Sequence, residues 1–208
     1  MFENKKEFKL ITKKNPKSLL PNALTIFGVC LGLSSIKFAL DTNYAMAIIA
    51  IGFAAILDTL DGRVARLIKG TSKIGKELDS LTDVISFGVA PGFIIYFWTL
   101  NEIGKFGWMF VLIYTVCCAL RLARFNLMII EENETWKINF FEGVPSPAAA
   151  GLVLLPLILS LSGIVQFENY TVLSSIAILT TSILMVSKIP TYSLKRILIP
   201  RHLAIFLL

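Results

Sequence analysis

The chain has 208 residues, of which 55% are hydrophobic and only 16% are charged, and its mean hydropathy is +0.73. Soluble globular domains carry about 25% charged residues, so this composition excludes an ordinary soluble protein and favours a polytopic membrane protein with one helical domain. The formal net charge of +6 does not by itself indicate nucleic-acid binding, because membrane proteins concentrate Lys and Arg on their cytoplasmic side.

Six apolar runs follow one another along the chain. A bilayer core about 30 Å thick requires about 20 helical residues to cross it. The segments that approach this length are 22–40, 44–60, 78–100, 106–122, 146–165 and 171–186. We therefore predict an all-α domain of six transmembrane helices over residues 20–187.

Two further segments flank this domain. Residues 1–19 are rich in lysine and contain no signal-peptide pattern, so we expect a basic juxtamembrane segment lying on an anionic surface, or a solvated tail. Residues 188–208 are expected to form a cytoplasmic or interfacial tail. Its last part, 201–208, is apolar but too short to span a bilayer, so it either rests at the interface or begins a further helix.

The basic residues indicate how the domain is oriented. Of the 20 Lys and Arg residues, all except Lys37 and Lys105 lie in the N-terminal segment, around the connections after the second and fourth runs, or beyond the sixth run. An excess of Lys and Arg marks the cytoplasmic side of a membrane. We therefore predict a multi-pass protein whose N-terminus and second connection face the cytoplasm, and no nucleic-acid partner is needed to explain the charge.

Four aspartates stand where the second run ends and the third begins: Asp58, Asp61, Asp79 and Asp83. A carboxylate at the centre of a bilayer costs roughly 2.5–3.5 kcal/mol on insertion scales, so aspartates near an apolar core indicate function. The spacings i,i+3 and i,i+4 place each pair on one face of a helix. If the two helices meet, the carboxylates converge, and such an all-oxygen set suits Mg²⁺ or Mn²⁺.

Small and basic residues accompany the aspartates. Gly62 and Ala65 allow a ligand or another helix to approach the backbone closely, and Arg66 offers a fork-shaped donor to a phosphate. Gly75 stands in the turn before the third run, and Ser72 can cap that helix or donate to a phosphate. Carboxylate-bound metal ions beside phosphate groups are typical of phosphoryl transfer.

The whole pattern, Asp58-x-x-Asp61-Gly62-x-x-Ala65-Arg66-x8-Gly75-x3-Asp79-x3-Asp83, resembles the signature of the CDP-alcohol phosphotransferases. These integral membrane enzymes displace CMP from a CDP-alcohol. The resemblance implies a six-helix fold, a homodimer, a polar cavity facing the cytoplasm and two divalent ions per active site. It implies that Asp58, Asp61 and Asp79 hold metal, and that Asp83 is both a metal ligand and the general base. It also implies a CDP-lipid site formed by Asn22, Thr25, Gly62, Ala65, Arg66, Ser72 and Gly75.

Three further segments, 21–25, 121–126 and 141–150, resemble the branch of the family that uses L-serine as acceptor. The implied reaction transfers a phosphatidyl group from CDP-diacylglycerol, or an ether-lipid equivalent, to L-serine and releases CMP. The carboxylate of serine would be repelled by the aspartates and phosphates in the cavity. A guanidinium group is therefore needed to bind that carboxylate. The candidates for binding serine are Arg121, Arg124, Asn126 and Ser146, and Ser146 is also expected to cap the fifth helix.

Other interpretations of these residues stay open. Another acceptor, such as glycerol 3-phosphate or an inositol phosphate, is compatible with the same signature. A cation transporter would also place aspartates in a membrane, although we find no internal repeat of the kind that transporters show. Arg121 and Arg124 also fit simple cytoplasmic anchors. Gly28 and Gly32 form a Gly-x-x-x-Gly pattern, which predicts close packing of the first helix against a neighbour.

Overall fold

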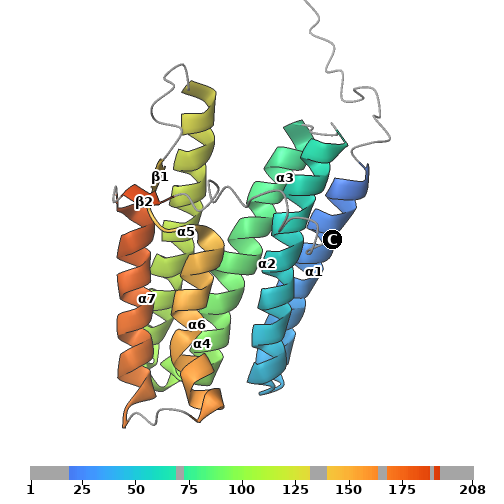
Figure 1. Ribbon diagram of the computed structural model, residues 1–208. Helices are drawn as coiled ribbons and strands as arrows, with labels where there is room; N and C mark the ends of the chain where they lie inside the picture. The colour runs from blue at the N-terminus through green and yellow to red at the C-terminus, as the bar shows by residue number, and fades with distance from the viewer. Residues whose placement is uncertain (1–18, 69–72, 132–139, 164–167, 188–189, 193–208) are drawn as a thin grey trace, which may run out of the picture.

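A computed structural model describes residues 19–68, 73–131, 140–163, 168–187 and 190–192 (Figure 1). Helices make up nearly all of this part of the chain. In order they are α1 (Leu19–Leu40), α2 (Tyr44–Leu67), α3 (Lys73–Asp83), the π-helix η2 (Val84–Val89), α4 (Ala90–Trp98), the 3-10 helix η3 (Leu100–Ile103), α5 (Lys105–Glu131), α6 (Ser146–Ser162) and α7 (Tyr170–Val186). The helical fold class is therefore confirmed.

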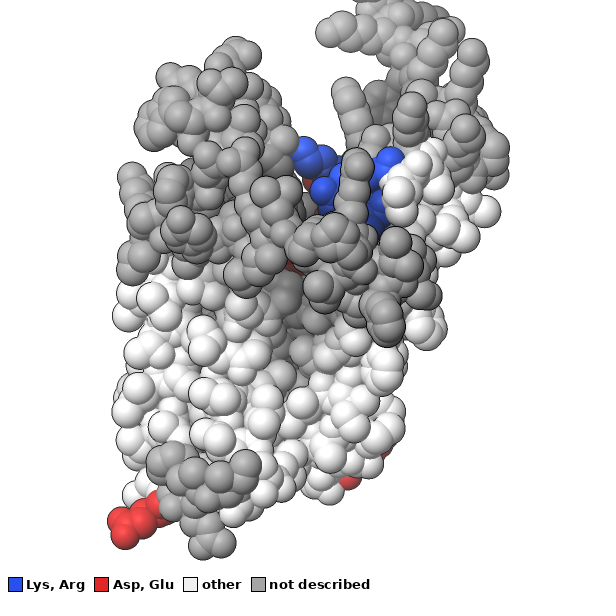
Figure 2. All heavy atoms as spheres, in the orientation of Figure 1, with Lys and Arg blue, Asp and Glu red and all other residues white. Residues whose placement is uncertain are grey.

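Four of the helical segments are long and apolar enough to cross a membrane. They are Leu19–Leu40, Tyr44–Leu67, Ile74–Trp98 and Lys105–Asn126, and the third of these runs through α3, η2 and α4. The apolar helices α6 and α7 are shorter, at 17 residues each. On the face shown in Figure 2, the coloured charged residues lie toward the two ends and the described flank between them is uncharged. These features support a polytopic membrane protein.

Several helices continue beyond the apolar runs that predicted them. α2 extends to Leu67 rather than stopping near residue 60, the third segment begins at Lys73, and α5 extends to Glu131. The added residues are mostly good helix formers such as Arg, Lys, Glu and Leu, so the backbone stays helical where the side chains turn polar. The aspartates and arginines of the predicted site consequently stand on helices.

The Gly-x-x-x-Gly prediction is confirmed by the packing of α1. A Cβ atom added at Gly28 would lie 3.5 Å from Thr82, and one added at Gly32 would lie 2.6 Å from Ser86 Oγ. The Ser86 hydroxyl also donates a hydrogen bond of 3.3 Å to the Gly28 carbonyl oxygen. These small residues bring α1 directly against the helix that carries Asp79 and Asp83.

A small β-sheet departs from the purely helical prediction. Strands β1 (Phe140–Glu142) and β2 (Pro190–Tyr192) pair antiparallel, with Phe141 opposite Thr191. They tie the chain before α6 to the chain after α7. Gly143 follows β1 with φ of +79°, and a Cβ there would lie 2.6 Å from the Met185 carbonyl oxygen. Three-residue strands carry too little periodicity to be found among apolar runs.

The apolar core is formed mainly by η2, α4, α5, α6 and α7, with Ala39 of α1 and small or apolar residues of α2 packed into it. Its largest fully buried side chains include Phe87, Ile94, Tyr114, Leu154 and Ile178. α1 and α2 pack along each other at the side of this core (Figure 1). α1 also packs against α3, so it contacts both helices that carry the aspartates.

Candidate active site

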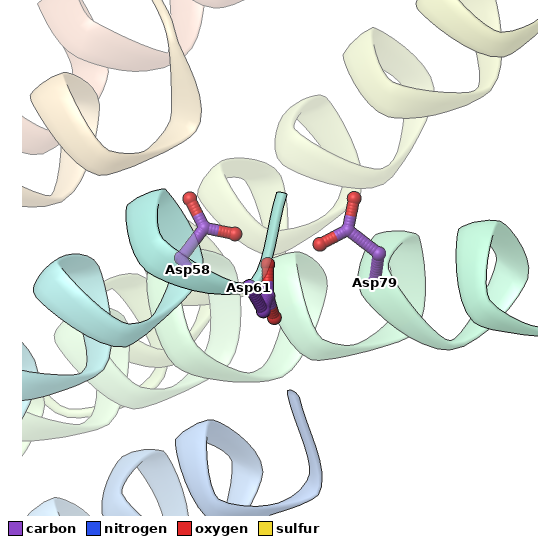
Figure 3. Close-up of side chains that lie close together, drawn as sticks. All are labelled: Asp58, Asp61 and Asp79. Carbon is purple, nitrogen blue, oxygen red and sulfur yellow. The ribbon is translucent and has the colours of Figure 1, made fainter. Parts of the chain in front are cut away.

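Three of the four predicted aspartates converge where α2 meets α3 (Figure 3). One carboxylate oxygen from each of Asp58, Asp61 and Asp79 lies within 4.8 Å of the other two. Asp61 is buried, with 5% of its surface exposed, and the other two are half-buried. Three carboxylates at this separation repel one another unless a cation lies among them, and their oxygens are the ligands that Mg²⁺ and Mn²⁺ prefer. The donor set therefore fits a hard divalent metal.

Asp83 lies beside this cluster rather than within it. It stands one helical turn after Asp79, and its carboxyl group is within hydrogen-bonding reach of Asp58. Its second oxygen, Oδ1, is buried and has no hydrogen-bond partner among the described residues. A buried acceptor atom without a partner costs about 1–3 kcal/mol, which indicates that a substrate or an ion completes this position.

Thr25 on α1 supports the cluster from below. Its Oγ1 atom lies 2.6 Å from Asp61 Oδ2 and 2.9 Å from the Pro21 carbonyl oxygen. Thr25 is 5% exposed, so this hydroxyl orients the carboxylate in a site that water does not reach freely. Sequence reasoning placed Thr25 beside the CDP-lipid but missed its contact with Asp61, because nothing in the spacing connects residues that lie 36 positions apart.

The remaining signature residues surround the end of α2. Arg66 is exposed, and its Nε donates a hydrogen bond of 2.9 Å to the Gly62 carbonyl oxygen one turn earlier. This contact holds the guanidinium group along the helix end. The rest of the predicted CDP-lipid set, Asn22, Ala65 and Gly75, is partly buried. Ser72 lies outside the described residues.

Arg121 and Ser146 form a second polar group next to Asp83. The Arg121 side chain is 9% exposed, and its Nη1 donates a hydrogen bond of 2.7 Å to Ser146 Oγ. Arg121 Nε is buried without a hydrogen-bond partner among the described residues, and the guanidinium interacts electrostatically with Asp83. A buried guanidinium is costly unless its donors are used.

The structure corrects the capping role expected of Ser146. The N-cap of α6 is Pro145, which makes no side-chain cap bond, and Ser146 is the first helical residue. Its side chain points instead to Arg121 of α5. The sequence Pro145-Ser146-Pro147 favours this start, because the second proline occupies an early helical position where its missing N–H costs nothing.

The two other predicted acceptor residues have different partners. Arg124 Nη1 donates a hydrogen bond of 2.9 Å to the carbonyl oxygen of Val186, the last residue of α7. The Asn126 amide donates one of 2.9 Å to Ser80 Oγ on α3. Ser80 was not predicted, although it stands directly after Asp79. The serine-binding roles of Arg124 and Asn126 stay predictions.

Fold and site together describe a helical bundle with four helices long and apolar enough to cross a membrane, and with a cluster of carboxylates at one end that could hold a metal ion. The family model of the CDP-alcohol phosphatidyltransferases matches residues 18–191. The chain belongs to this family, and the resemblance noted from its aspartate spacing is confirmed.

Several curated relatives carry the name CDP-diacylglycerol–serine O-phosphatidyltransferase. The protein of Mycobacterium leprae is 41% identical over 187 residues, which is 89% of this chain and 62% of that protein. The Helicobacter pylori protein (strain 26695) is 45% identical over 145 residues, 70% of this chain and 60% of the relative. The Bacillus subtilis protein is 35% identical over 170 residues, 82% of this chain and 88% of the relative. The chain thus spans under two thirds of the mycobacterial and Helicobacter relatives.

Proposed function

We propose that the chain transfers a phosphatidyl group from CDP-diacylglycerol, or an ether-lipid equivalent, to L-serine and releases CMP. The observation that carries this proposal is the convergence of Asp58, Asp61 and Asp79, whose oxygens lie within 4.8 Å of one another. Membership of the family supports the reaction class, and the name of relatives about 40% identical over about 90% of the chain supports serine as the acceptor.

Asp58, Asp61 and Asp79 would hold the divalent metal, with Asp83 at the edge of the group. We expect two ions per active site, Mg²⁺ or Mn²⁺. Such ions neutralise the charge of a diphosphate during phosphoryl transfer. Thr25 keeps Asp61 in one orientation through the 2.6 Å contact, and outer contacts of this kind tune how tightly a carboxylate binds metal.

The chain's own residues supply the proton transfer. In the proposed reaction the serine hydroxyl oxygen attacks the lipid-bearing phosphorus, and the bond between that phosphorus and the CMP oxygen breaks. Asp83 accepts the hydroxyl proton. Its free Oδ1 atom is buried beside the metal-binding aspartates, which is where a general base must reach the acceptor.

The CDP part of the donor is assigned to the end of α2 and the start of α1. Arg66 offers a cation to the phosphates, and Gly62 and Ala65 allow close approach to the helix backbone. Asn22, Thr25, Ser72 and Gly75 complete the proposed lipid-nucleotide site. Figure 2 shows Lys and Arg side chains toward the upper end of the molecule, with acidic atoms visible beside them.

We also propose that this end of the bundle faces the cytoplasm. The support is the distribution of the 20 Lys and Arg residues along the sequence: all but two stand before the first apolar run, around the connections after the second and fourth runs, or after the sixth. If the six runs all cross the membrane, these positions share the side of the aspartates, and an excess of Lys and Arg marks the cytoplasmic side. The domain 20–187 would then carry six membrane passages, with α6 and α7 as the short ones, and residues 1–19 and 188–208 would lie at the same membrane face. A homodimer is the expected assembly. Reporter fusions at both ends of α1 test the orientation.

The reaction is tested by supplying purified protein with a CDP-lipid, Mn²⁺ or Mg²⁺, and one acceptor at a time. The acceptors are L-serine, glycerol 3-phosphate and inositol phosphate, and the measurement is CMP release. We expect release that depends on L-serine and on the metal. Release only with a phosphorylated acceptor would change the substrate, and no release with any acceptor would overturn the enzymatic assignment.

The role of Asp83 is tested by Asp83→Asn, which keeps the size of the side chain but removes the base. We expect folded protein with at least about 10²-fold lower kcat, in the range that general-base catalysis contributes. Titration with Mn²⁺ separates loss of the base from loss of the metal, because a pure metal defect is reversed by excess ion. Near-normal turnover by this variant would contradict the assignment.

A further inference from the structure

The two arginines of the α5 segment do different things, although they stand three residues apart. The Arg124 guanidinium donates to the Val186 carbonyl oxygen over 2.9 Å, so it closes the C-terminal end of α7, where carbonyl groups lack helical partners. Arg121 donates a hydrogen bond to a side chain, that of Ser146, and keeps a buried Nε–H without a partner among the described residues. Arg124 therefore stabilises the end of α7, whereas Arg121 has a buried hydrogen-bond donor that is not used.

An unused hydrogen-bond acceptor on Asp83 accompanies the unused Nε–H donor of Arg121. Asp83 Oδ1 is buried without a hydrogen-bond partner in the described part of the chain. Asp83 and Arg121 attract each other electrostatically, yet no hydrogen bond joins them. Because these two oppositely charged groups are buried but do not hydrogen-bond to each other, Asp83 Oδ1 and Arg121 Nε both remain unsatisfied. Each such buried atom costs about 1–3 kcal/mol of stability. A molecule that donates to Asp83 and accepts from Arg121 removes both costs.

Ser146 fixes which part of the guanidinium remains available. It is 1% exposed and accepts the Nη1–H bond at 2.7 Å. The buried thiol of Cys118, one turn before Arg121, lies within hydrogen-bonding reach of the same hydroxyl. Because the guanidinium is planar and its donors keep fixed angles to one another, holding Nη1 restricts the directions in which Nε–H can point.

We propose that Ser146 is a positioning residue, which holds Arg121 so that its free Nε–H binds the carboxylate of the acceptor while Asp83 receives the acceptor's hydroxyl. The acceptor class is a small hydroxy acid that bridges these two atoms. This inference rests on the proposed function and sharpens it: Arg121 selects the acceptor, Ser146 acts through Arg121, and Arg124 anchors α7.

The test compares Arg121→Lys, Ser146→Ala and Arg124→Lys in the full chain, with the KM for L-serine and the KM for the CDP-lipid measured separately. We expect Arg121→Lys to raise the KM for L-serine about tenfold or more, because an ammonium group cannot reach Ser146 and the carboxylate together. Ser146→Ala raises it by about threefold, since the guanidinium is loosened but still present. Both variants leave the KM for the CDP-lipid within about twofold.

Arg124→Lys is the matched comparison. Losing the bond to Val186 is expected to lower the melting temperature and kcat, with the ratio of the two KM values unchanged. L-serinamide, which lacks the carboxylate, gives a second measurement as a competitor of L-serine. The preference of the wild-type protein for L-serine over the amide should shrink in Arg121→Lys and in Ser146→Ala.

The proposal is overturned if both KM values rise together in Ser146→Ala, or if the preference over the amide is unchanged in both variants. An Arg121→Lys protein that does not fold leaves Ser146→Ala to decide, since that change removes a single hydroxyl group. Failure of the proposed function looks different, because the wild-type protein then releases no CMP with L-serine.

Discussion

The hydroxyl group of Tyr114 on α5 donates a hydrogen bond of 2.7 Å to the main-chain carbonyl oxygen of Phe87. Both residues are fully buried. In a regular helix this carbonyl would accept from the residue four positions later, but that residue is Pro91, which has no N–H. The Tyr114 hydroxyl thus supplies the Phe87 carbonyl oxygen with the hydrogen-bond donor that Pro91 lacks. It supports the π-helix Val84–Val89, which begins directly after Asp83.

Replacing Tyr114 by Phe should therefore destabilise the protein and disturb Asp83. The change leaves a buried carbonyl oxygen without this donor, which costs about 1–3 kcal/mol. We expect a lower melting temperature in detergent and a lower kcat, with a smaller effect on the KM for the CDP-lipid. Tyr96→Phe is the control, because the Tyr96 ring keeps its contacts with Phe97 and Trp108. Equal melting temperatures for the two variants would contradict the supporting role.

The close contact of α1 with the third segment predicts a strong effect at Gly32. A Cβ atom there would lie 3.0 Å from the Ser86 main chain, which cannot rotate away. Gly32→Ala should push the helices apart and cost about 1–3 kcal/mol of stability. Gly52→Ala on α2 is the matched control, since a Cβ at that position meets nothing within 4 Å. Thermal unfolding in detergent compares the two, and the idea fails if Gly32→Ala is the more stable.

Thr25→Val tests whether the hydroxyl on α1 supports the metal-binding carboxylate. Valine has nearly the same shape, so the main change is loss of the 2.6 Å contact with Asp61. Loss of an outer contact to a metal ligand lowers metal affinity by about 10–100-fold. We expect the Mn²⁺ concentration for half-maximal activity to rise, with activity recovered at high Mn²⁺.

Thr59→Val is the comparison for this change. Thr59 lies between the aspartates on α2, but it is exposed and its hydroxyl bonds to the Ala55 carbonyl oxygen. The Mn²⁺ dependence of this variant should match that of the wild-type protein. A shift of the same size in both variants would show that the Thr25 contact has no special role.

Much of the site could be predicted from the sequence because helical geometry is local. The spacings of Asp58 with Asp61 and of Asp79 with Asp83 place each pair on one face, and the signature spacing pairs the two helices. The family followed from these facts and is confirmed. Three of the four aspartates converge as a group that could hold a metal ion. The continuation of α5 beyond residue 122 was not predicted, because an apolar run indicates which part of a helix contacts lipid and does not indicate where the helix ends.

Contacts between distant segments were harder to foresee. Ser146 was expected to cap its own helix, yet it accepts from Arg121, 25 residues earlier. Arg121 and Arg124 look equivalent along the chain, and only the position of the end of α7 distinguishes them. The same holds for Thr25 with Asp61. Each depends on how helices pack, which no local pattern records.

Removal of the metal should lower the stability of the protein, because the clustered carboxylates then repel one another. One carboxylate oxygen from each of Asp58, Asp61 and Asp79 lies within 4.8 Å of the other two in the folded chain, so without a cation their repulsion should lower stability. We expect a chelator to abolish CMP release and to lower the melting temperature. Metal at about 100 times its Kd would restore about 2.7 kcal/mol through binding to the folded state alone.

A single substitution separates this repulsion from a general loss of structure. Asp58→Asn removes one negative charge from the cluster, so the metal-free variant should melt at a higher temperature than the metal-free wild-type protein. The same variant should gain little from Mn²⁺ and release little CMP, because a ligand has been lost. Asp41→Asn is the control, since Asp41 is exposed at the end of α1 and pairs with Lys37. If metal-free Asp58→Asn melts below the metal-free wild type, repulsion is not what the metal relieves, and the cluster is held together by its surrounding helices.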